Sequence, residues 1–407
     1  MKNLFTNLIL VATFFLVSNA DAQTAYITNV NTNNVSVINV ANNTVTATIP
    51  VGNYPYGVSV SADGSKVYVA NQNAATVSVI NTATNAVSAT FPVSAGPQCL
   101  DVSPDGSRLY VANSGSVDVI NTSNNSVITT IAGFTYSQGI VVSSDGRKVY
   151  VVISSPLHSV IIIDAVADTI LTTVQVGGSP MGITILPNGS KVYIANSGGN
   201  TVSVIDTLTN TVSTTIPVGF FPMGISASPD GRKVYVINSS DSTMSVINTS
   251  VDTVSAVIHL SSASEGISIT PDGSKVYVTN YYDNTVNSID TLTNTVSAPI
   301  TVGAHPIAFG NFISTYSQPT GIVSQGNEPS TISLYPNPAS TVLNIHHSPC
   351  TSQETLLITD ILGTEVYKEI PTGIDNTIFI STWSAGIYFY EVRSSNDIAR
   401  GKFVKMN

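Results

Sequence analysis

The chain has 407 residues, of which only 9% are charged, and a formal net charge of −10 at pH 7. Its 14 Lys and Arg residues are outnumbered by 24 Asp and Glu, so no basic stripe is available for nucleic acid. The two cysteines, Cys99 and Cys350, lie in different regions, so no disulfide framework is implied. The length allows one large domain and one small one.

Residues 1–22 have the pattern of a secretory signal peptide. Lys2 supplies the positive start, residues 8–17 form an apolar stretch, and Ala20-Asp21-Ala22 gives a small-x-small cleavage site. The apolar stretch is too short to cross a membrane, and no other segment approaches 18 uninterrupted apolar residues. We therefore expect no transmembrane segment and a mature chain that begins at Gln23, outside the cytoplasm.

A tyrosine recurs at nearly equal intervals, with steps of 42, 42, 40, 43, 42 and 42 residues. Each copy opens a Tyr-Val or Tyr-Ile pair within a short β-patterned segment. Such a period is typical of a propeller blade. The repeat predicts an all-β fold with a seven-bladed β-propeller over residues 23–313. The seven copies are Tyr26, Tyr68, Tyr110, Tyr150, Tyr193, Tyr235 and Tyr277.

Residues 57–93 illustrate one blade. β-Branched residues alternate with others in four runs, which predicts an antiparallel four-stranded meander. An Asp-Gly pair, Asp63-Gly64 here, joins the first two runs and recurs in other blades, because a tight hairpin needs the positive φ that glycine adopts freely. The four runs are Gly57–Ser61, Val67–Ala70, Val77–Ile80 and Val87–Phe91.

A second turn position carries Asn or Asp in every repeat. Ca²⁺ ligation or paired-carboxylate catalysis would require the carboxylates, whereas a turn explains the Asn copies as well, since both residues tolerate the left-handed conformation. We therefore expect seven turns here rather than an acidic site. The positions are Asn43, Asn85, Asn125, Asp168, Asn210, Asp252 and Asn294.

The first repeat lacks its first strand, because Tyr26 follows the signal peptide almost directly. A matching run, Pro306–Phe312, appears after the last repeat. We expect this run to pair with the strand at Tyr26, so that one blade is completed from both ends of the domain. Such closure removes free sheet edges.

The repeated motifs, such as KVYVAN (66–71) and KVYVTN (275–280), resemble the YVTN family of β-propeller repeats. That family includes archaeal surface-layer proteins and other extracytoplasmic proteins, so the resemblance implies a location outside the cytoplasm. It implies no particular activity, since the family shares none. The fourth repeat departs from the pattern, because the Asn is missing after Tyr150.

The remaining chain differs in pattern from the repeats. Residues 314–329 are polar, with Pro and Gly, and are expected to be a linker. Residues 330–407 are expected to form a small β-sandwich, which on composition alone could be an adhesive module. Its strand-like runs are Leu343–His346, Leu356–Thr359, Glu365–Lys368 and Ile387–Val392.

Four segments of this tail resemble the type A C-terminal sorting domain of the Bacteroidota type IX secretion system. They are LYPNPASTVLNI (334–345), ITDILGTEVYK (358–368), ISTWSAGIYFYEV (380–392) and GKFVK (401–405). The resemblance implies that the type IX machinery is a partner. It also implies export across both membranes, with the product secreted or attached to the outer-membrane surface.

One face of the propeller is expected to carry no Lys or Arg. All eight cations of the repeats follow the glycine turns, so the loops that lead into each first strand lie on an uncharged face where an anionic ligand is disfavoured. The cations are Lys66, Arg108, Arg147, Lys148, Lys191, Arg232, Lys233 and Lys275.

Aromatic residues gather in the loops of this uncharged face. Together with nearby Asn, Gln and Ser they suit stacking on a sugar or a peptide, although each ring could instead fill a gap between blades. We predict a binding or adhesion module for glycan or protein. The candidate residues are Tyr54, Tyr56, Tyr136, Phe220, Phe221, Tyr281 and Tyr282.

Glu265 and His305 occupy equivalent loops of adjacent repeats and belong to the same candidate site. The pair could act as acid and base or within a metal site, so a propeller enzyme of lactonase or lyase type is an alternative. The chain has no haem attachment motif, phosphate loop or nucleophile elbow, and we predict no catalytic residues, no metal and no cofactor. A third alternative is a structural surface-layer-like subunit, for which regular blades with few charges would suffice.

Overall fold

The computed structural model describes residues 23–314 and, towards the C-terminus, residues 332–335, 342–347, 355–360, 364–369, 375–384, 386–393 and 398–405. The chain divides into two compact units, one within residues 1–320 and one within residues 321–407. The expected signal peptide, and all of the expected linker except Ser314, lie outside the described residues. The described part is all-β, as expected, and its one helix is the short turn η1, Ser239–Asp241.

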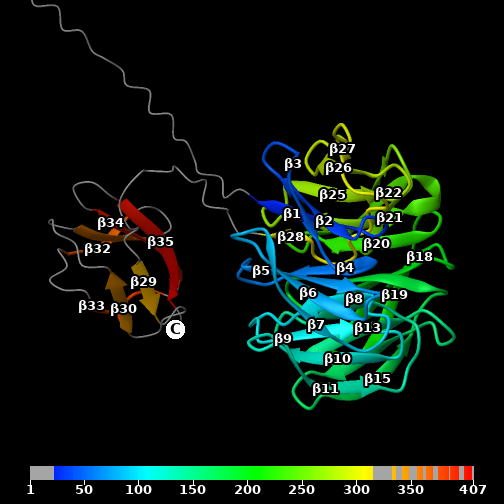
Figure 1. Cartoon of the computed structure of the whole chain (residues 1–407), viewed down its shortest axis with the longest axis horizontal. Coiled ribbons are helices and arrows are strands. Elements are labelled where there is room, and N and C mark those ends of the chain that lie inside the picture. Colours follow the sequence, from blue (N-terminus) through cyan, green and yellow to red (C-terminus); the bar gives the residue numbers. More distant parts are fainter. Residues whose placement is uncertain are drawn as a thin grey trace, which may run out of the picture. The chain divides into compact units, whose positions relative to one another are not determined.

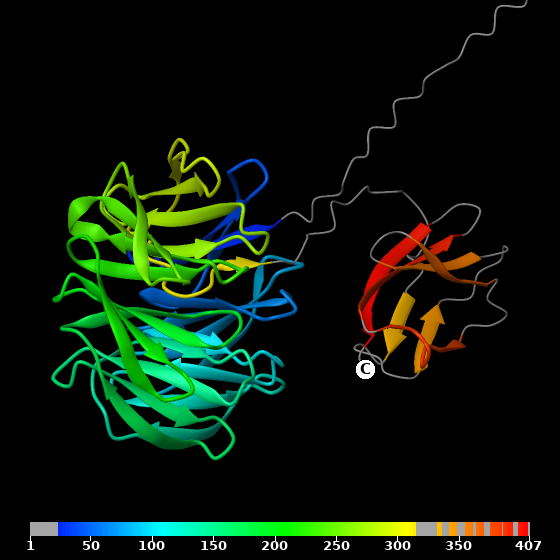
Figure 2. The ribbon, with the colours of Figure 1, turned by 180° about the vertical axis from the view of Figure 1, so that it is seen from behind.

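The first unit consists of seven four-stranded antiparallel sheets, named blades 1 to 7 (Figures 1 and 2). Each blade contacts the next, and blade 7 contacts blade 1, so the blades form a closed ring. Blade 1 contains β28 (Ile313–Ser314), β1 (Thr24–Asn29), β2 (Asn34–Asn39) and β3 (Thr44–Pro50). Blade 2 contains β4 (Pro55–Val60), β5 (Lys66–Asn71), β6 (Thr76–Asn81) and β7 (Ala86–Pro92).

The other five blades follow in chain order. Blade 3 has β8 (Cys99–Val102), β9 (Arg108–Ala112), β10 (Ser116–Asn121) and β11 (Ser126–Ala132). Blade 4 has β12 (Ser137–Val142), β13 (Lys148–Ile153), β14 (Ser159–Asp164) and β15 (Thr169–Gln175). Blade 5 has β16 (Pro180–Ile185), β17 (Lys191–Asn196), β18 (Thr201–Asp206) and β19 (Thr211–Pro217). Blade 6 has β20 (Pro222–Ala227), β21 (Lys233–Asn238), β22 (Thr243–Asn248) and β23 (Thr253–His259). Blade 7 has β24 (Ser264–Ile269), β25 (Lys275–Asn280), β26 (Thr285–Asp290) and β27 (Ile300–Thr301).

Both repeated turns adopt the backbone that their residues favour. The glycines of the Asp-Gly and Asn-Gly turns have φ of 70–72°, and the seven Asn and Asp residues of the second turn have φ of 49–59°. Asn and Asp tolerate this left-handed region better than other side-chain-bearing residues do. The turn interpretation of these Asn and Asp positions is confirmed.

The innermost strands of neighbouring blades approach each other at glycines. A Cβ atom added at Gly182 would lie 2.2 Å from the carbonyl oxygen of Met223, and one added at Gly57 would lie 2.3 Å from that of Gln98. Only glycine permits so close an approach. Cys99 in blade 3 and Ala308 in the closing segment stand at the same place in the repeat, so the inner ring is not uniform.

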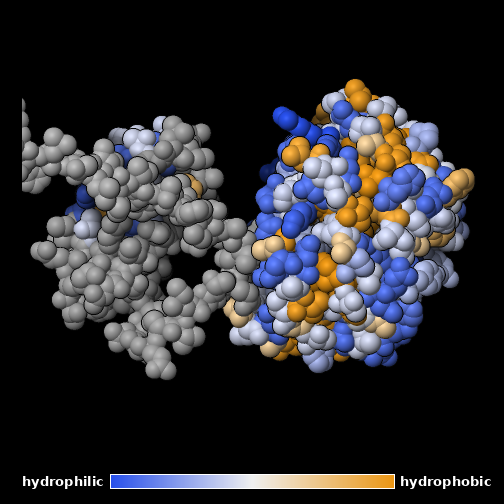
Figure 3. Space-filling view, turned by 90° about the horizontal axis from the view of Figure 1, so that it is seen from above, coloured by the Kyte–Doolittle hydropathy of each residue, from blue (hydrophilic) through white to orange (hydrophobic). Residues whose placement is uncertain are grey.

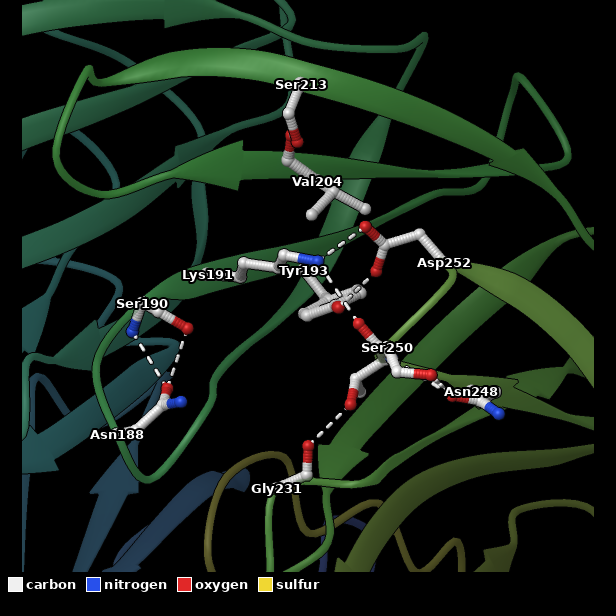
Figure 4. A network of polar contacts seen from close by, with 11 residues as sticks. Asn188, Ser190, Lys191, Tyr193, Val204, Ser213, Gly231, Asn248, Ser250 and Asp252 are labelled. Carbon is white, nitrogen blue, oxygen red and sulfur yellow. Dashed lines mark hydrogen bonds and ion pairs between the residues drawn. The ribbon is translucent and has the colours of Figure 1, made fainter.

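Polar side chains also join neighbouring blades, through the repeated Tyr and the Asn or Asp of the second turn. The Oη of Tyr193 in blade 5 donates a 2.6 Å hydrogen bond to Asp252 in the second turn of blade 6, and the Nζ of Lys191 lies 2.7 Å from the same carboxylate (Figure 4). The Oη of Tyr277 in blade 7 likewise donates to Asn43 of blade 1, at 2.5 Å. We call this arrangement the blade clasp.

Several cations that follow the glycine turns belong to blade clasps. Arg108 forms a 2.9 Å ion pair with Asp168 of the next blade, and Lys148 donates to Asn210 at 3.0 Å. Lys66 and Lys275 donate to backbone carbonyls in the second turn of the following blade. The sequence revealed where these cations lie, but not that they hold the blades together.

The ring closes by pairing between the two ends of the unit, as expected, although the regular ladder lies just beyond the expected residues. The regular ladder joins β28 to β1 through Ser314 and Ile313, whereas the expected strand was Pro306–Phe312. Within the expected run, Pro306 bridges to Asn29 and the N–H of Ile307 donates to the carbonyl oxygen of Thr28 at 3.0 Å. At its other end, the carbonyl oxygen of Phe312 accepts a 2.8 Å hydrogen bond from the N–H of Tyr26. Between these points the segment bulges, with φ of 43° at Ala308 and 114° at Gly310, and it pairs instead with β4 of blade 2.

The second unit contains two antiparallel sheets. One has the order β29-β30-β33 and the other β32-β31-β34-β35. Side chains from both sheets, such as Leu343, Ile358 and Tyr388, share one apolar core, as a β-sandwich requires. The strands are β29 (Ile332–Tyr335), β30 (Val342–His347), β31 (Thr355–Thr359), β32 (Glu365–Glu369), β33 (Asp375–Phe379), β34 (Gly386–Arg393) and β35 (Ile398–Lys405).

The blade clasp predicts different effects for the same substitution in two blades. Tyr193→Phe should lower the free energy of unfolding by about 1–2 kcal/mol, because the partly buried Asp252 loses a hydrogen bond. Tyr150→Phe should change it little or raise it slightly, because the buried Tyr150 hydroxyl has no hydrogen-bond partner among the described residues. Denaturant unfolding of the two variants and the unaltered chain measures both effects. If both variants lost the same free energy of unfolding, the hydrogen bond between Tyr193 and Asp252 would contribute nothing to stability.

Candidate functional site

The loops that lead from one blade to the next gather at one end of the ring, which we call the crossover end. In several of these loops, the residue before the first strand has a left-handed backbone, with φ of 54–56°. This conformation is unfavourable by roughly 1–2 kcal/mol for a residue with a side chain. Four aromatic residues have this position and conformation, Tyr54, Tyr136, Phe221 and His305, and Ser179 has it with φ of 50°.

Asn side chains from the preceding blade hold these loops in place. The N–H of Tyr54 donates to Oδ1 of Asn33 at 2.9 Å, and the N–H of His305 donates to Asn284 at 2.8 Å. The N–H of Phe221 is bonded to Asn200 in the same way, at 3.1 Å. The rings are therefore presented from a fixed backbone. These Asn residues were not singled out in the sequence, although their phase in the repeat could have revealed them.

Several candidate residues meet on one arc of the crossover end, formed by loops of blades 7, 1 and 2. Tyr281 stacks on His305 with ring centroids 4.5 Å apart, and Tyr282 meets Tyr281 edge-on at 5.0 Å. His305 Nδ1 is also in contact with the side-chain amide of Asn31. Tyr54 packs with Tyr281 against a shared apolar group.

Tyr56 lies deeper on the same arc. Its ring stacks on Phe309 at 5.6 Å, nearly parallel. Tyr56 therefore fills a gap beside the closing segment, while Tyr282 is 70% exposed and available to a ligand. We name Tyr54, Tyr56, Tyr281, Tyr282, His305 and Glu265 the tyrosine cluster.

Glu265 is the acidic member of the tyrosine cluster. It lies partly buried in β24, and burial raises the pKa of its carboxyl group to about 7. Burial also raises the pKa of Tyr56 well above its usual value, with further contributions from Cys99 and Glu265. The pKa of Tyr281 is raised by burial and by its interactions with Tyr54 and Glu265. Near pH 7 Tyr56 and Tyr281 are thus neutral and Glu265 is only partly ionised.

Three other candidate rings lie apart from the tyrosine cluster. Tyr136, Phe220 and Phe221 are 60%, 62% and 44% exposed, so they do not fill gaps between blades. None of these three rings stacks on a member of the tyrosine cluster. Apolar side chains are interspersed with polar ones on the surface seen in Figure 3. The nine candidate residues therefore form one compact group and separate exposed rings.

The cluster offers flat ring faces and hydrogen-bonding groups with little net charge. Within the described residues, no three His, Cys, Asp or Glu side chains gather in a group that could hold a metal ion. Each described Lys or Arg of the propeller lies in a glycine turn or at the start of the strand after it, away from the crossover end. Such a surface suits a neutral polar ligand better than an anion.

Comparison with known proteins assigns the second unit. The family model described as the secretion system C-terminal sorting domain matches residues 333–406. No curated protein matches the sequence significantly. In the described part of the chain, no helix has the length and apolar character needed to span a membrane.

Solved structures support the fold of the first unit. The chain is similar to hydrazine synthase of Kuenenia stuttgartiensis, with a TM-score of 0.61 and 20% identity, covering 66% of this chain and 92% of that one. It is also similar to a functionally unknown protein from Desulfotomaculum acetoxidans, with a TM-score of 0.61 and 17% identity, covering 70% and 99%. At these identities the likeness shows the fold alone. The chain thus combines a propeller-like β unit with a type IX C-terminal sorting domain, and it is secreted to the cell surface or the extracellular space.

Proposed function

We propose that the first unit is a binding module that recognises an uncharged glycan or protein segment through the tyrosine cluster. The observation that carries this proposal is the stack of Tyr281 on His305, with the exposed ring of Tyr282 beside it. Stacked and edge-on aromatic groups offer apolar faces together with polar edges, which matches a sugar ring or a peptide side chain. The sorting domain would deliver this surface outside the cell.

The rigidity of the loops supports binding. Because Asn33 and Asn284 fix the backbone at Tyr54 and His305, little conformational freedom is lost there when a ligand is bound. We infer that the separate rings of Tyr136, Phe220 and Phe221 extend contact to a long or branched ligand around the rim. We also assign the repeats to the YVTN type and the export route to that of Bacteroidota, on the motifs that carry those resemblances.

An enzyme is the second candidate. A carboxyl group with a pKa near 7 is suited to proton transfer at neutral pH, and His305 lies on the same arc as Glu265. A lactonase or lyase would require both groups at the reacting atoms, whereas binding requires neither to change its protonation. A structural surface-layer-like subunit would bury the same rings between copies of the chain.

Replacing Tyr281 and Tyr282 with Ala should weaken ligand capture, with a loss of about 1 kcal/mol or more for each contacting ring. Glycan and peptide arrays probed with the full chain would measure the capture. Phe379→Ala is the matched control, because this exposed ring lies in the second unit and should not contribute. The proposal is contradicted if the double variant binds like the control, or if the unaltered chain captures no probe.

The raised pKa of Glu265 predicts a pH-dependent stability difference. The folded state binds a proton more tightly than the unfolded state, so the unaltered chain loses stability as the pH rises from about 4.5 to 7. Glu265→Gln should be equally stable below this range and more stable above it, by at most roughly 3 kcal/mol. Thermal melts from pH 4 to 8 test the difference. Turnover of a lactone or glycan that disappears in Glu265→Gln would favour the enzyme.

Deletion of residues 330–407 should leave the propeller folded but trap it in the periplasm, because the type IX machinery would have no signal to recognise. Fractionation of the native host, with the unaltered chain as reference, would locate the protein. Delivery of the shortened chain to the surface or the medium would contradict a sorting role for these residues.

A further inference from the structure

The inner strands of all seven blades enclose a cavity of about 560 Å³. Its lining begins at inner-strand glycines such as Gly182 and Gly224 and ends at Pro187 and Pro229, which precede the glycine turns. The residues that come before these glycine positions in the inner strands, such as Glu265, do not line the cavity. The cavity therefore extends from these glycines towards the end of the ring that carries the glycine turns, and we call it the chamber. It adjoins the tyrosine cluster at Phe309, which lines the chamber and stacks on Tyr56.

Most of the chamber wall repeats from blade to blade. Most inner strands contribute an apolar residue at one level of the wall, and these residues form the apolar level. The residue after it in the strand belongs to a second level, in which most residues are small and polar, such as Thr184, Ser226 and Ser268. Asp101 of blade 3 occupies that second level and is the only charged side chain in the lining. The apolar level consists of Leu100, Ile140, Ile183, Ile225, Ile267 and Phe309.

The departures from the repeat concentrate on one arc of the chamber. Blade 3 has Cys99 in place of glycine and Asp101 in place of a hydroxyl residue or valine. The closing segment bulges at Gly310 and Asn311. A Cβ atom added at Gly310 would lie 2.3 Å from the carbonyl oxygen of Val58 and 3.9 Å from that of Leu100, so the bulge reaches past blade 2 towards Asp101.

Asp101 is held firmly, but no Lys or Arg in the described part of the chain forms an ion pair with it. Its carboxylate accepts hydrogen bonds from the N–H of Val142 at 2.8 Å, from Ser59 Oγ at 3.1 Å and from the N–H of Val102 at 3.1 Å. Burial raises its pKa to about 6, so it is mostly ionised at pH 7. Three hydrogen bonds offset part of the free energy lost when this carboxylate is partly removed from bulk water, and the lining provides no cation to offset the rest.

We propose that the chamber binds a small organic cation, an aliphatic primary amine, with its ammonium group at Asp101 and its methylene groups against the apolar level. One carboxylate in a space of this volume is a poor site for a metal ion, which needs several ligands at short distance. An anion would be repelled by Asp101. This proposal does not rest on the tyrosine cluster, because no member of that cluster lines the chamber and the two adjoin at Phe309.

Calorimetric titration of the full chain with n-pentylamine, n-pentanol and pentanoate tests the proposal, at about pH 8 where Asp101 is ionised. The three probes have similar chains but carry a positive, a neutral and a negative head. We expect saturable binding of the amine only. Asp101→Ser should weaken it by about tenfold or more, since a desolvated charge pair is lost. This variant should fold, because Ser59, Ser226 and Ser268 occupy the same level in other blades.

Asp105→Asn is the matched control. It removes one negative charge from the same blade, outside the chamber lining, and gives blade 3 the Asn-Gly turn that Asn188 forms in blade 5. Amine binding by this variant should equal that of the unaltered chain. The proposal is overturned if the amine does not bind, if pentanol binds equally well, or if Asp101→Ser binds the amine as tightly as Asp105→Asn does.

Discussion

Most blades are held to their neighbours by polar side chains that bridge to the second turn of the next blade, and the ring depends on this blade clasp. The turn needs Asn or Asp for its left-handed backbone, and the same side chain then offers an oxygen across the blade boundary. Tyr193 and Lys191 reach one such oxygen pair on Asp252, and Tyr277 reaches Asn43 to complete the circle. One residue therefore serves both the local turn and the contact between blades.

The clasp and the close approach of the inner glycines leave little freedom for the repeats to vary. Variation is possible where neither is involved, in the crossover loops and along the chamber wall. The exposed aromatic rings lie in the crossover loops, and the carboxylate of Asp101 lies in the chamber wall. Because the framework is set by the repeated residues, the loops can carry aromatic residues in an unfavourable backbone conformation such as that of Tyr54.

Much of the fold could be predicted from the sequence, because the repeated Tyr, the Asp-Gly pairs and the Asn or Asp turns each report local backbone geometry. The sequence predicts the closing segment, and both ends of Pro306–Phe312 bond to β1, but the regular ladder lies just beyond this run. Gly310 and Asn311 add a bulge that periodicity cannot reveal, and pairing therefore moves to Ile313 and Ser314. The site was harder to predict. The position of the loops in the repeat predicts that the aromatic residues lie at one end of the ring. Only the packing distinguishes Tyr56, which stacks on Phe309, from Tyr282, which is exposed.

Closure between β1 and β28 also determines when the propeller can become complete during synthesis. The bond from Tyr277 to Asn43 spans 234 residues, and the edge of β1 gains its partners only from the segment between Pro306 and Ser314. Contacts so distant in sequence form slowly, and an unpaired strand edge invites association with other chains. The first blade must therefore wait for almost the whole domain before its edge is covered. The closing strand of the first blade comes immediately before the region that leads to the sorting domain. A chain interrupted before this strand would therefore lack both the closing strand and the export signal.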